Sequence, residues 1–497
     1  MTRLGLPHQT VSDNPIPQLV IGYVSVQGSE SVFGRKGKRL RKSPKAYYAK
    51  KSDRDSVRRD LEKNGFSIIS ETALGMSVVA PGGAYEDITG GELQAIERLM
   101  YCEAGRTQYV THLDIVGDKQ PTALGVGAAK SKTLKIDGIV LERPRIYHAI
   151  FPSPIPPNSP KFHLRVPGDV EVALNAVAAH QQGQRGGGVL VAMPDSGWFR
   201  HPFFTAHGYN IKTPIAIVPG TDRSKDPQGH GTGESANIFA VAPEAVLQPL
   251  RASNDDGDLV GAIAGFLKAK DIRPKIITCS WGGDELFPPS SDPPESELPF
   301  VAEIQDAIAQ GILVVFSAGN GQFSVEPQAP GVLAAGGVFM DSNGDLRASD
   351  YASGYQSTWF DQHVVPTVCG LVGMQPRAQY LMLPVPPDSS IDQDESKPDE
   401  TDPTTDGTPG DDGWALFSGT SAAAPQLAGA AALLLGAKPN LTPAQVIEAM
   451  TKTATDVVVG RSFPQRFNNP AGPGPDLATG AGIINVGAAL QFAVDRF

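Results

Sequence analysis

Cysteine is scarce in this chain of 497 residues, which contains only Cys102, Cys279 and Cys369. Three scattered cysteines cannot form the disulfide framework of a small secreted domain, and their odd number fits a reducing compartment. A cytoplasmic location is therefore expected. None of the three lies in a motif that would activate its thiol, which argues against a cysteine protease.

Long apolar runs and an excess of positive charge are also missing. No run approaches the roughly 18 apolar residues that a membrane-spanning helix needs, and the first ten residues, MTRLGLPHQT, do not begin a signal peptide. The net charge of −11 argues against a nucleic-acid-binding protein. The chain is expected to be soluble, with neither membrane nor nucleic acid among its partners.

The composition is that of a globular protein with many loops. Hydrophobic residues make up 40% and charged residues 19%, beside 54 glycines and 43 prolines. These proportions suit an α/β enzyme with long surface connections. A chain of this length is expected to form two domains.

A serine at the start of an apolar helix is the most informative feature of the sequence. Residues 419–425 read Gly-Thr-Ser-Ala-Ala-Ala-Pro and precede an apolar run over residues 427–435. A serine hydroxyl is a poor nucleophile by itself. Ser421 therefore needs a neighbouring base and a group that binds the oxyanion formed when it attacks a carbonyl.

Three upstream segments offer candidates for these partners. Asp195 ends the apolar run 188–194, which indicates a buried strand with a carboxylate at its C-terminal end. His230 lies in Gly-His-Gly-Thr-Gly, where small residues allow close approach and a helix can begin. Asn320 ends a second apolar strand among glycines, and its side-chain amide is a candidate for the oxyanion hole.

Each of these segments alone has an ordinary structural explanation, as a turn, a loop histidine or a common loop composition. Together, their order along the chain and the signatures D-S-G, H-G-T, A-G-N and G-T-S-A-A-A-P resemble the subtilases, the subtilisin-like serine peptidases. The resemblance covers residues 166–497. It implies an α/β fold, with a parallel sheet flanked by helices, and hydrolysis of peptide bonds through an acyl-enzyme.

The resemblance also implies a role for each candidate. Ser421 would attack the carbonyl, His230 would take its proton, and Asp195 would orient the imidazole. Asn320 and the backbone N–H of Ser421 would bind the oxyanion. Two other classes of function remain open: a subtilase-fold pseudoenzyme that binds peptides or a partner without cutting them, and an amidase or esterase that acts on small substrates.

Two further segments are candidates for substrate binding. In subtilases an S-x-G segment forms a wall of the pocket for the residue before the scissile bond, and Ser280, Trp281 and Gly282 match it here. Gly257, in an acidic glycine turn, is a candidate for the opposite substrate-pairing segment. The structural alternatives are a buried strand with a glycine turn and an ordinary surface turn.

Residues 1–115 are predicted to form a small α+β domain with the order β-α-β-β-α-β. This ferredoxin-like order resembles the propeptide that precedes many subtilase catalytic domains, where it acts as folding chaperone and inhibitor, so packing of this domain on the catalytic domain is expected. The expected strands are 18–26, 66–70, 76–80 and 107–113, and the expected helices are 54–64 and 91–99. A basic run over 35–51 is interpreted as a solvated loop, with a nucleic-acid patch as the alternative.

The rest of the chain divides into a linker and a catalytic domain. Proline clusters predict a linker over 116–165, which includes the strand-like stretch 133–141. The catalytic domain is expected over 166–497. Within it, residues 388–412 are predicted to be an acidic, disordered insertion, because they hold too few apolar side chains to order themselves.

No cofactor is predicted, because the calcium site common in the family is not expected. Many subtilases read His-Pro-Asp-Leu after the aspartate motif, whereas this chain has Phe203-Phe204 after His-Pro. Gly233 stands where a second histidine is usual, and the segment that follows is short. Calcium binding by the acidic insertion is the alternative.

Overall fold

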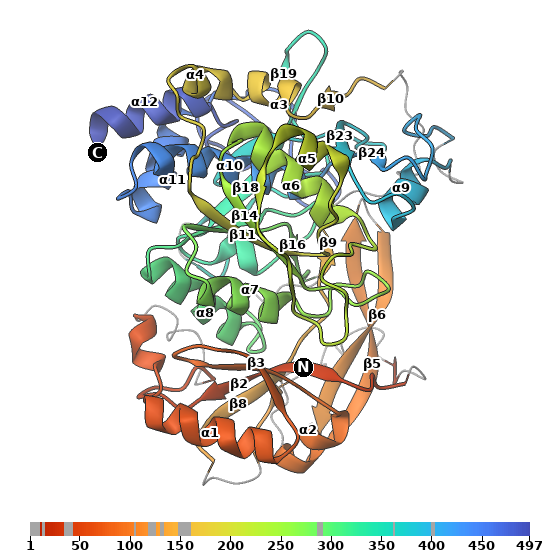
Figure 1. Cartoon of the computed structure of the whole chain (residues 1–497), viewed down its shortest axis with the longest axis vertical. Helices are drawn as coiled ribbons and strands as arrows, with labels where there is room; N and C mark the ends of the chain where they lie inside the picture. The colour runs from red at the N-terminus through yellow and green to blue at the C-terminus, as the bar shows by residue number, and fades with distance from the viewer. Residues whose placement is uncertain are drawn as a thin grey trace, which may run out of the picture.

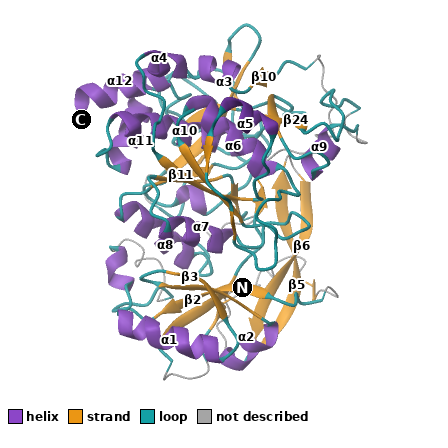
Figure 2. Cartoon of the chain, in the orientation of Figure 1, coloured by secondary structure: helices purple, strands orange, loops and turns teal. Residues whose placement is uncertain are grey.

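The computed structural model describes residues 10–11, 15–33, 43–103, 106–117, 126–129, 134–147, 161–285, 292–360, 363–398 and 403–497. In Figure 1 a larger C-terminal unit, coloured from yellow to blue, lies above a smaller N-terminal unit in red and orange. Figure 2 shows that helices cover the sheets of both units. Residues 35–42 of the predicted basic loop lie outside the described residues, and its later part contains the 3₁₀ turn η1 (Pro44–Tyr47).

A mostly parallel, nine-stranded sheet forms the centre of the larger unit. Neighbouring strands are parallel along the sheet from β12 to β18, and β19 is antiparallel to β18 at the end of the sheet. β13 (Ile215–Ala216) pairs with β14, and β22 (Val368–Leu371) pairs with β18. The main strands, in spatial order, are β12 (Asn210–Ile211), β14 (Val246–Arg251), β11 (Leu190–Asp195), β15 (Ile276–Cys279), β17 (Leu313–Ser317), β18 (Leu333–Met340) and β19 (Leu346–Ala348).

Helices cover both faces of this sheet, which explains why its strands are apolar at successive positions. On β11, Val191 belongs to one hydrophobic cluster and Ala192 to another on the opposite face. The first cluster includes α6 (His230–Val241) and α10 (Thr420–Ala437), and the second includes α7 (Ala262–Asp271) and α8 (Leu298–Ala309). The predicted fold class is confirmed.

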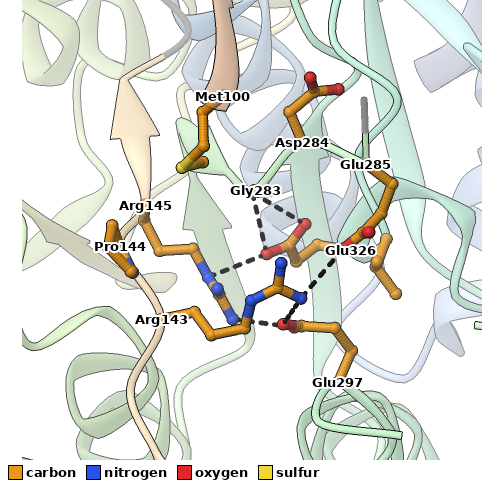
Figure 3. A pocket seen from close by; sticks show the side chains of 10 residues that line it. Met100, Arg143, Pro144, Arg145, Gly283, Asp284, Glu285, Glu297 and Glu326 are labelled. Carbon is orange, nitrogen blue, oxygen red and sulfur yellow. Dashed lines mark hydrogen bonds and ion pairs between the residues drawn. The ribbon is translucent and has the colours of Figure 1, made fainter. Parts of the chain in front are cut away.

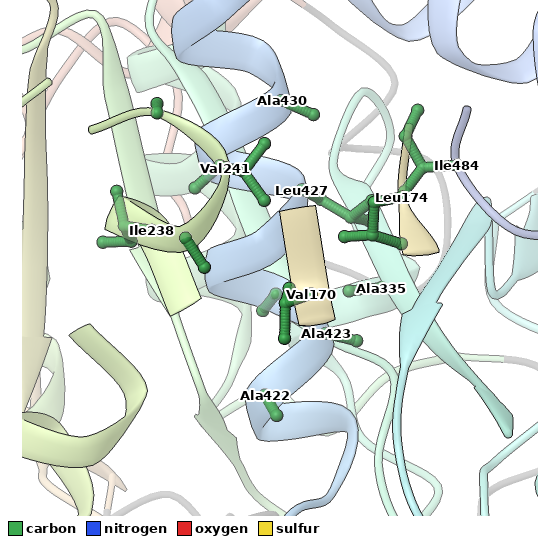
Figure 4. Close-up of a cluster of buried hydrophobic side chains, with 14 of the residues drawn as sticks. Val170, Leu174, Ile238, Val241, Ala335, Ala422, Ala423, Leu427, Ala430 and Ile484 are labelled. Carbon is green, nitrogen blue, oxygen red and sulfur yellow. The ribbon is translucent and has the colours of Figure 1, made fainter. Parts of the chain in front are cut away.

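The core helix α10 is long and apolar enough, by length and composition, to cross a membrane. However, 89% of its apolar window is buried inside the protein. Figure 4 shows Ala423 and Leu427 on this helix among side chains from neighbouring elements, including Val170 and Ile238. The apolar composition of α10 is therefore explained by its place in the protein core.

The N-terminal unit contains a five-stranded sheet in the order β3-β4-β2-β8-β7. Its elements are β2 (Val20–Val26), α1 (Lys51–Lys63), β3 (Ser67–Glu71), β4 (Gly75–Ala80), α2 (Gly82–Thr89), β7 (Val126–Gly127) and β8 (Ile136–Leu141). Strand β8, which completes the ferredoxin-like order beside β2, comes from the segment predicted as a linker.

The prediction of a second helix over 91–99 is wrong. This stretch belongs to β5 (Glu92–Glu103), which forms a long hairpin with β6 (Arg106–Val116), and the second helix is α2. Gly90 ends α2 in a left-handed conformation, with φ of 72°. Leu93 and Ala95 are then buried at alternate positions, the period of a strand. The predicted strand 107–113 exists, but it pairs in this hairpin and not in the main N-terminal sheet.

The prediction of a disordered acidic insertion over 388–412 is wrong for its described residues. Helix α9 (Ser390–Glu395) forms there, and Asp392 and Glu395 are buried. Arg377 Nη2 lies 3.4 Å from Glu395 Oε2, and Asp392 Oδ2 accepts the backbone N–H of Gly413. The composition of the segment does not reveal this order, because partners outside the acidic run neutralise its charge.

The remaining elements are short strands, 3₁₀ turns and peripheral helices. They are β1 (Thr10–Val11), η1 (Pro44–Tyr47), β9 (Ile146–Tyr147), β10 (Leu164–Arg165), α3 (Gly168–Ala173), α4 (Ala176–Gln181), α5 (Pro202–His207), β16 (Trp281–Gly282), η2 (Glu326–Gln328), β20 (Tyr355–Gln356), β21 (Val364–Val365), β23 (Leu381–Pro384), β24 (Trp414–Phe417), α11 (Pro443–Thr453) and α12 (Val486–Arg496).

The two units meet through α7 and α8. Strands β3 and β4 pack on α7, and η1 packs on α8. Glu303 of α8 accepts hydrogen bonds from Tyr23 Oη at 2.5 Å and Thr72 Oγ1 at 2.7 Å, and it pairs with Lys270 of α7 at 2.5 Å. Tyr48 donates to Asp306. Both units thus contribute partners to one buried polar cluster.

Candidate active site

Asp195 and His230 form a buried pair. Asp195 is the last residue of β11, and His230 is the first residue of α6. The His230 Nδ1 atom lies 2.7 Å from Asp195 Oδ1, and neither side chain is exposed. Burial would lower the pKa of His230, but the charge of Asp195 and its hydrogen bond outweigh burial and raise that pKa above its ordinary value. This arrangement suits a base whose cation is stabilised by a carboxylate.

A network around the start of α6 holds His230 in place. Asp226 accepts hydrogen bonds from the backbone N–H of Gly229 at 3.0 Å and of Thr232 at 2.8 Å. Gln228 Oε1 accepts the N–H of His230 at 2.7 Å. Gly229 has φ of 93°, and a Cβ there would lie 2.7 Å from Ser389 Oγ, so only glycine fits. These contacts satisfy the first N–H groups of the helix.

Ser421 lies in the first turn of α10, at the same end of the sheet as His230. The side chain of Gln426 on α10 bonds Asn237 on α6 at 3.2 Å, and Gly429 lies against Ile238, so the two helices run side by side in parallel. The N-terminal ends of α6 and α10, which contain His230 and Ser421, therefore lie at the same end of the helix pair. The Ser421 hydroxyl donates to the carbonyl oxygen of Ser280 at 3.0 Å.

Asn320 is held against the same helix end. Its Oδ1 accepts the N–H of Thr420 at 2.9 Å and the Thr420 hydroxyl at 3.0 Å. Thr420 Oγ1 also accepts the N–H of Gly319 at 3.1 Å. Because Oδ1 faces Thr420, the Nδ2 group is the end of the Asn320 amide that can donate to a bound oxyanion.

The predicted substrate-binding residues lie near these groups but differ in what they contribute. Ser280 Oγ donates to the carbonyl oxygen of Ser421 at 2.8 Å. The side chain of Trp281 is fully buried and donates to Pro194 O at 2.7 Å, so this indole belongs to the core. Gly257 packs against Gln228, which precedes the histidine.

Strand β16, which contains Trp281 and Gly282, is occupied by the chain itself. It pairs antiparallel with β9, so that Tyr147 lies opposite Trp281 and Ile146 opposite Gly282. An extended peptide that adds to a strand in this way gains backbone hydrogen bonds irrespective of its sequence. Strand β9 lies in the segment predicted as a linker, and β16 lies in the segment predicted as a wall of the substrate pocket.

Sequence analysis did not single out two buried acidic residues near His230, Asp226 and Glu234. Asp226 fixes the loop before His230, as described above. Glu234 lies one helical turn after His230, fully buried, and accepts a hydrogen bond from Asn237 Nδ2 at 2.9 Å. Burial raises the pKa of Glu234 to about 8, while the nearby histidine opposes that shift. In the sequence, the i, i+4 spacing of His230 and Glu234 is the only signal that these two side chains lie close together.

The structure explains the departures from the usual calcium-site sequence. Phe204 is buried and packs against Trp198 and Phe239, with ring centroids 5.3 Å and 6.2 Å away. A Cβ on Gly233 would lie 2.3 Å from the Phe417 ring, so a second histidine does not fit. Among the described residues, no three His, Cys, Asp or Glu side chains gather where they could hold a metal ion.

We therefore predict that calcium does little for stability. A chelator should shift the melting temperature by less than about 2 °C, which is at most ~2 kcal/mol for a protein of this size. Differential scanning calorimetry with and without chelator measures the shift. A larger drop would reveal a site elsewhere, and residues 388–412 would be the first place to search.

Comparison with known proteins identifies the family. The model of the Subtilase family matches residues 186–482. Fervidolysin from Fervidobacterium pennivorans is 28% identical over 402 residues, covering 73% of this chain and 51% of fervidolysin. The chain thus spans about half the length of that relative. Subtilisin BL from Lederbergia lenta is 26% identical over 64% of this chain and 96% of its own length.

A solved structure agrees with this result at the level of the fold. The crystal structure of fervidolysin has a TM-score of 0.54 and 20% identity, and the match covers 95% of this chain and 61% of fervidolysin. The family model spans more than half of the chain and includes Asp195, His230, Asn320 and Ser421. On this basis the chain belongs to the subtilase family.

Proposed function

We propose that this chain is a serine endopeptidase that hydrolyses peptide bonds through an acyl-enzyme. The observation that carries the proposal is the buried contact between His230 Nδ1 and Asp195 Oδ1 at 2.7 Å. With Nδ1–H donated to the carboxylate, the imidazole presents Nε2 as the base. His230 takes the proton of Ser421, and the hydroxyl oxygen attacks the substrate carbonyl.

The oxyanion formed in this attack is stabilised by two kinds of group. The Nδ2 group of Asn320 and the backbone N–H of Ser421 donate hydrogen bonds to it. Ser421 lies in the first turn of α10, so the positive end of the helix dipole also faces the developing charge. His230 then passes its proton to the leaving amine, and water releases the acyl group in a second, equivalent step.

Replacing Asn320 by alanine tests the oxyanion assignment. Turnover should fall by about 100 to 1000-fold, the loss measured when the equivalent donor of a subtilisin is removed. KM for a peptide substrate should change much less, because this donor acts mainly in the transition state. Asn343→Ala, in an exposed turn, serves as the matched control. Unchanged turnover in Asn320→Ala would refute the assignment.

A comparison of substrates separates this proposal from the alternatives. The full chain is incubated with casein and, separately, with a small p-nitrophenyl ester. An endopeptidase cuts both and produces internal fragments of casein. Ester hydrolysis alone would indicate an esterase. The absence of both activities, in the full chain and in a variant with Ile146 and Tyr147 replaced by proline to disrupt the pairing of β9 with β16, would indicate a pseudoenzyme that binds without cutting.

We also propose that the N-terminal unit acts as an intramolecular inhibitor, as propeptides of the family do. The support is the pairing of β9 with β16, which places the chain's own backbone on the predicted substrate wall. The backbone N–H of Ala264, in the first turn of α7, also donates to Glu142 at 2.9 Å. A chain in this arrangement must release residues 146–147 before a peptide can bind β16.

A further inference from the structure

An acidic pocket filled by arginines lies beside β16, and the mechanism above does not use it. Figure 3 shows Arg143 and Arg145, from the segment after β8, facing three glutamates. Arg145 Nη2 lies 2.9 Å from Glu297 Oε2, and its Nε lies 3.1 Å from Glu326 Oε1. Arg143 Nη1 lies 3.0 Å from both Glu285 Oε1 and Glu297 Oε1.

The glutamates are assembled from separate segments of the catalytic unit. Glu285 follows β16, Glu297 directly precedes α8, and Glu326 begins η2. The side chains of Glu297 and Glu326 are only 4% and 2% exposed. Buried carboxylates this close together repel one another and lose hydration, so they require a positive partner. A planar guanidinium, which can bond two carboxylates at once, suits this geometry better than an ammonium.

Backbone pairing places this pocket within the path of a bound peptide. Tyr147 lies opposite Trp281 and Ile146 opposite Gly282, and the side chain of the next residue, Arg145, passes Gly283, where a Cβ would lie 3.9 Å from Arg145 Nη1. The N–H of Gly283 itself donates to Glu326 Oε1 at 3.3 Å. A peptide that binds β16 in the same direction would carry one side chain into the same pocket.

We propose that Glu285, Glu297 and Glu326 form a subsite that recognises an arginine side chain of a peptide substrate lying antiparallel on β16. Arg143 and Arg145 fill this subsite in the intact chain. The inference rests on the proposed peptidase function and gives it a substrate class. Favoured peptides carry arginine two positions before the residue that lies opposite Trp281.

Hydrolysis of matched peptides tests the subsite. The substrate is a quenched fluorogenic decapeptide with the sequence of residues 142–151, ERPRIYHAIF, and the control peptide has citrulline in place of both arginines. Citrulline keeps the shape and removes the charge. We expect full-length molecules that have released residues 146–147 from β16 to cut the arginine peptide with kcat/KM at least tenfold higher than the citrulline peptide. Glu326→Gln should reduce this ratio to below about threefold, whereas Glu244→Gln, on the surface, should leave it unchanged.

A binding measurement keeps the inference separate from catalysis. In the full-length Ser421→Ala protein, the additional change Arg145→Ala empties the part of the pocket beside Glu326 and leaves Arg143 in place. Nα-acetyl-arginine methylamide should raise its melting temperature more than the citrulline analogue does, and adding Glu326→Gln should remove the difference.

The outcomes distinguish the two proposals. Equal cutting of both decapeptides, with casein also cut, overturns the subsite and leaves the peptidase function intact. No hydrolysis of any substrate, by the full-length protein or by the variant with Ile146 and Tyr147 replaced by proline, together with selective stabilisation by the arginine compound, overturns the peptidase function and supports the subsite as a binding site. If neither hydrolysis nor selective stabilisation is seen, both proposals are wrong. If Arg145→Ala does not fold, the two decapeptides still decide the matter, because they require no change in the protein.

Discussion

Replacing Ser421 by alanine should lower peptide hydrolysis by several orders of magnitude while leaving the fold intact. The hydroxyl is the only nucleophile that the protein supplies in the proposed mechanism, so its loss leaves only the rate supplied by substrate binding and the oxyanion hole. Its one hydrogen bond as a donor goes to the carbonyl oxygen of Ser280, which limits the structural cost of the change. Initial rates on a quenched peptide measure the loss.

The control for this change is Ser342→Ala, because Ser342 lies in an exposed turn and takes no part in the mechanism. Melting temperatures of both variants should stay close to that of the unmodified protein. If Ser421→Ala keeps its activity at an unchanged melting temperature, the mechanism is wrong.

Replacing Asp195 by asparagine should lower turnover by about 10⁴-fold, the loss known from the equivalent change in a serine protease of another fold. Asparagine carries no negative charge, so the imidazole of His230 no longer has a carboxylate that stabilises its cation. The N–H of Ser196 also donates to Asp195 Oδ1 at 2.7 Å, and the asparagine oxygen can still accept it.

The pH profile gives this variant a second readout. Activity requires neutral His230, and the negative charge of Asp195 raises the pKa of that imidazole. Removing the charge lowers the pKa, so the acid limb of the residual activity should move to lower pH. Asp345→Asn, in an exposed turn, is the control. An acid limb at the original pH would mean that Asp195 does not act on the histidine.

The larger fold could be predicted from sequence because its local patterns agree with its tertiary environment. Strands such as β11 and β17 are buried on both faces and appear in the sequence as apolar runs. Helix α10 begins within the serine motif, at Thr420. Each predicted catalytic residue also lies at the end or start of such an element, where a parallel sheet gathers its functional groups.

Other features depend on partners distant in sequence, which local patterns do not contain. The apolar residues of β5 fit a helix as well as a strand. Pairing with β6 makes this segment a strand. Helix α9 is ordered by Arg377 and by the backbone of Gly413, outside the acidic run. The charged pocket combines Arg145 with Glu297 and Glu326, separated by more than a hundred residues.

Labelling with a fluorophosphonate tests the central claim, that His230 activates Ser421, most directly. The reagent phosphonylates only an activated serine and requires no knowledge of the natural substrate. Peptide mass spectrometry of the labelled full-length protein should find one adduct, on Ser421, and no adduct in His230→Ala treated in the same way. An adduct on another serine, or equal labelling of Ser421 in the presence and absence of His230, would contradict the account.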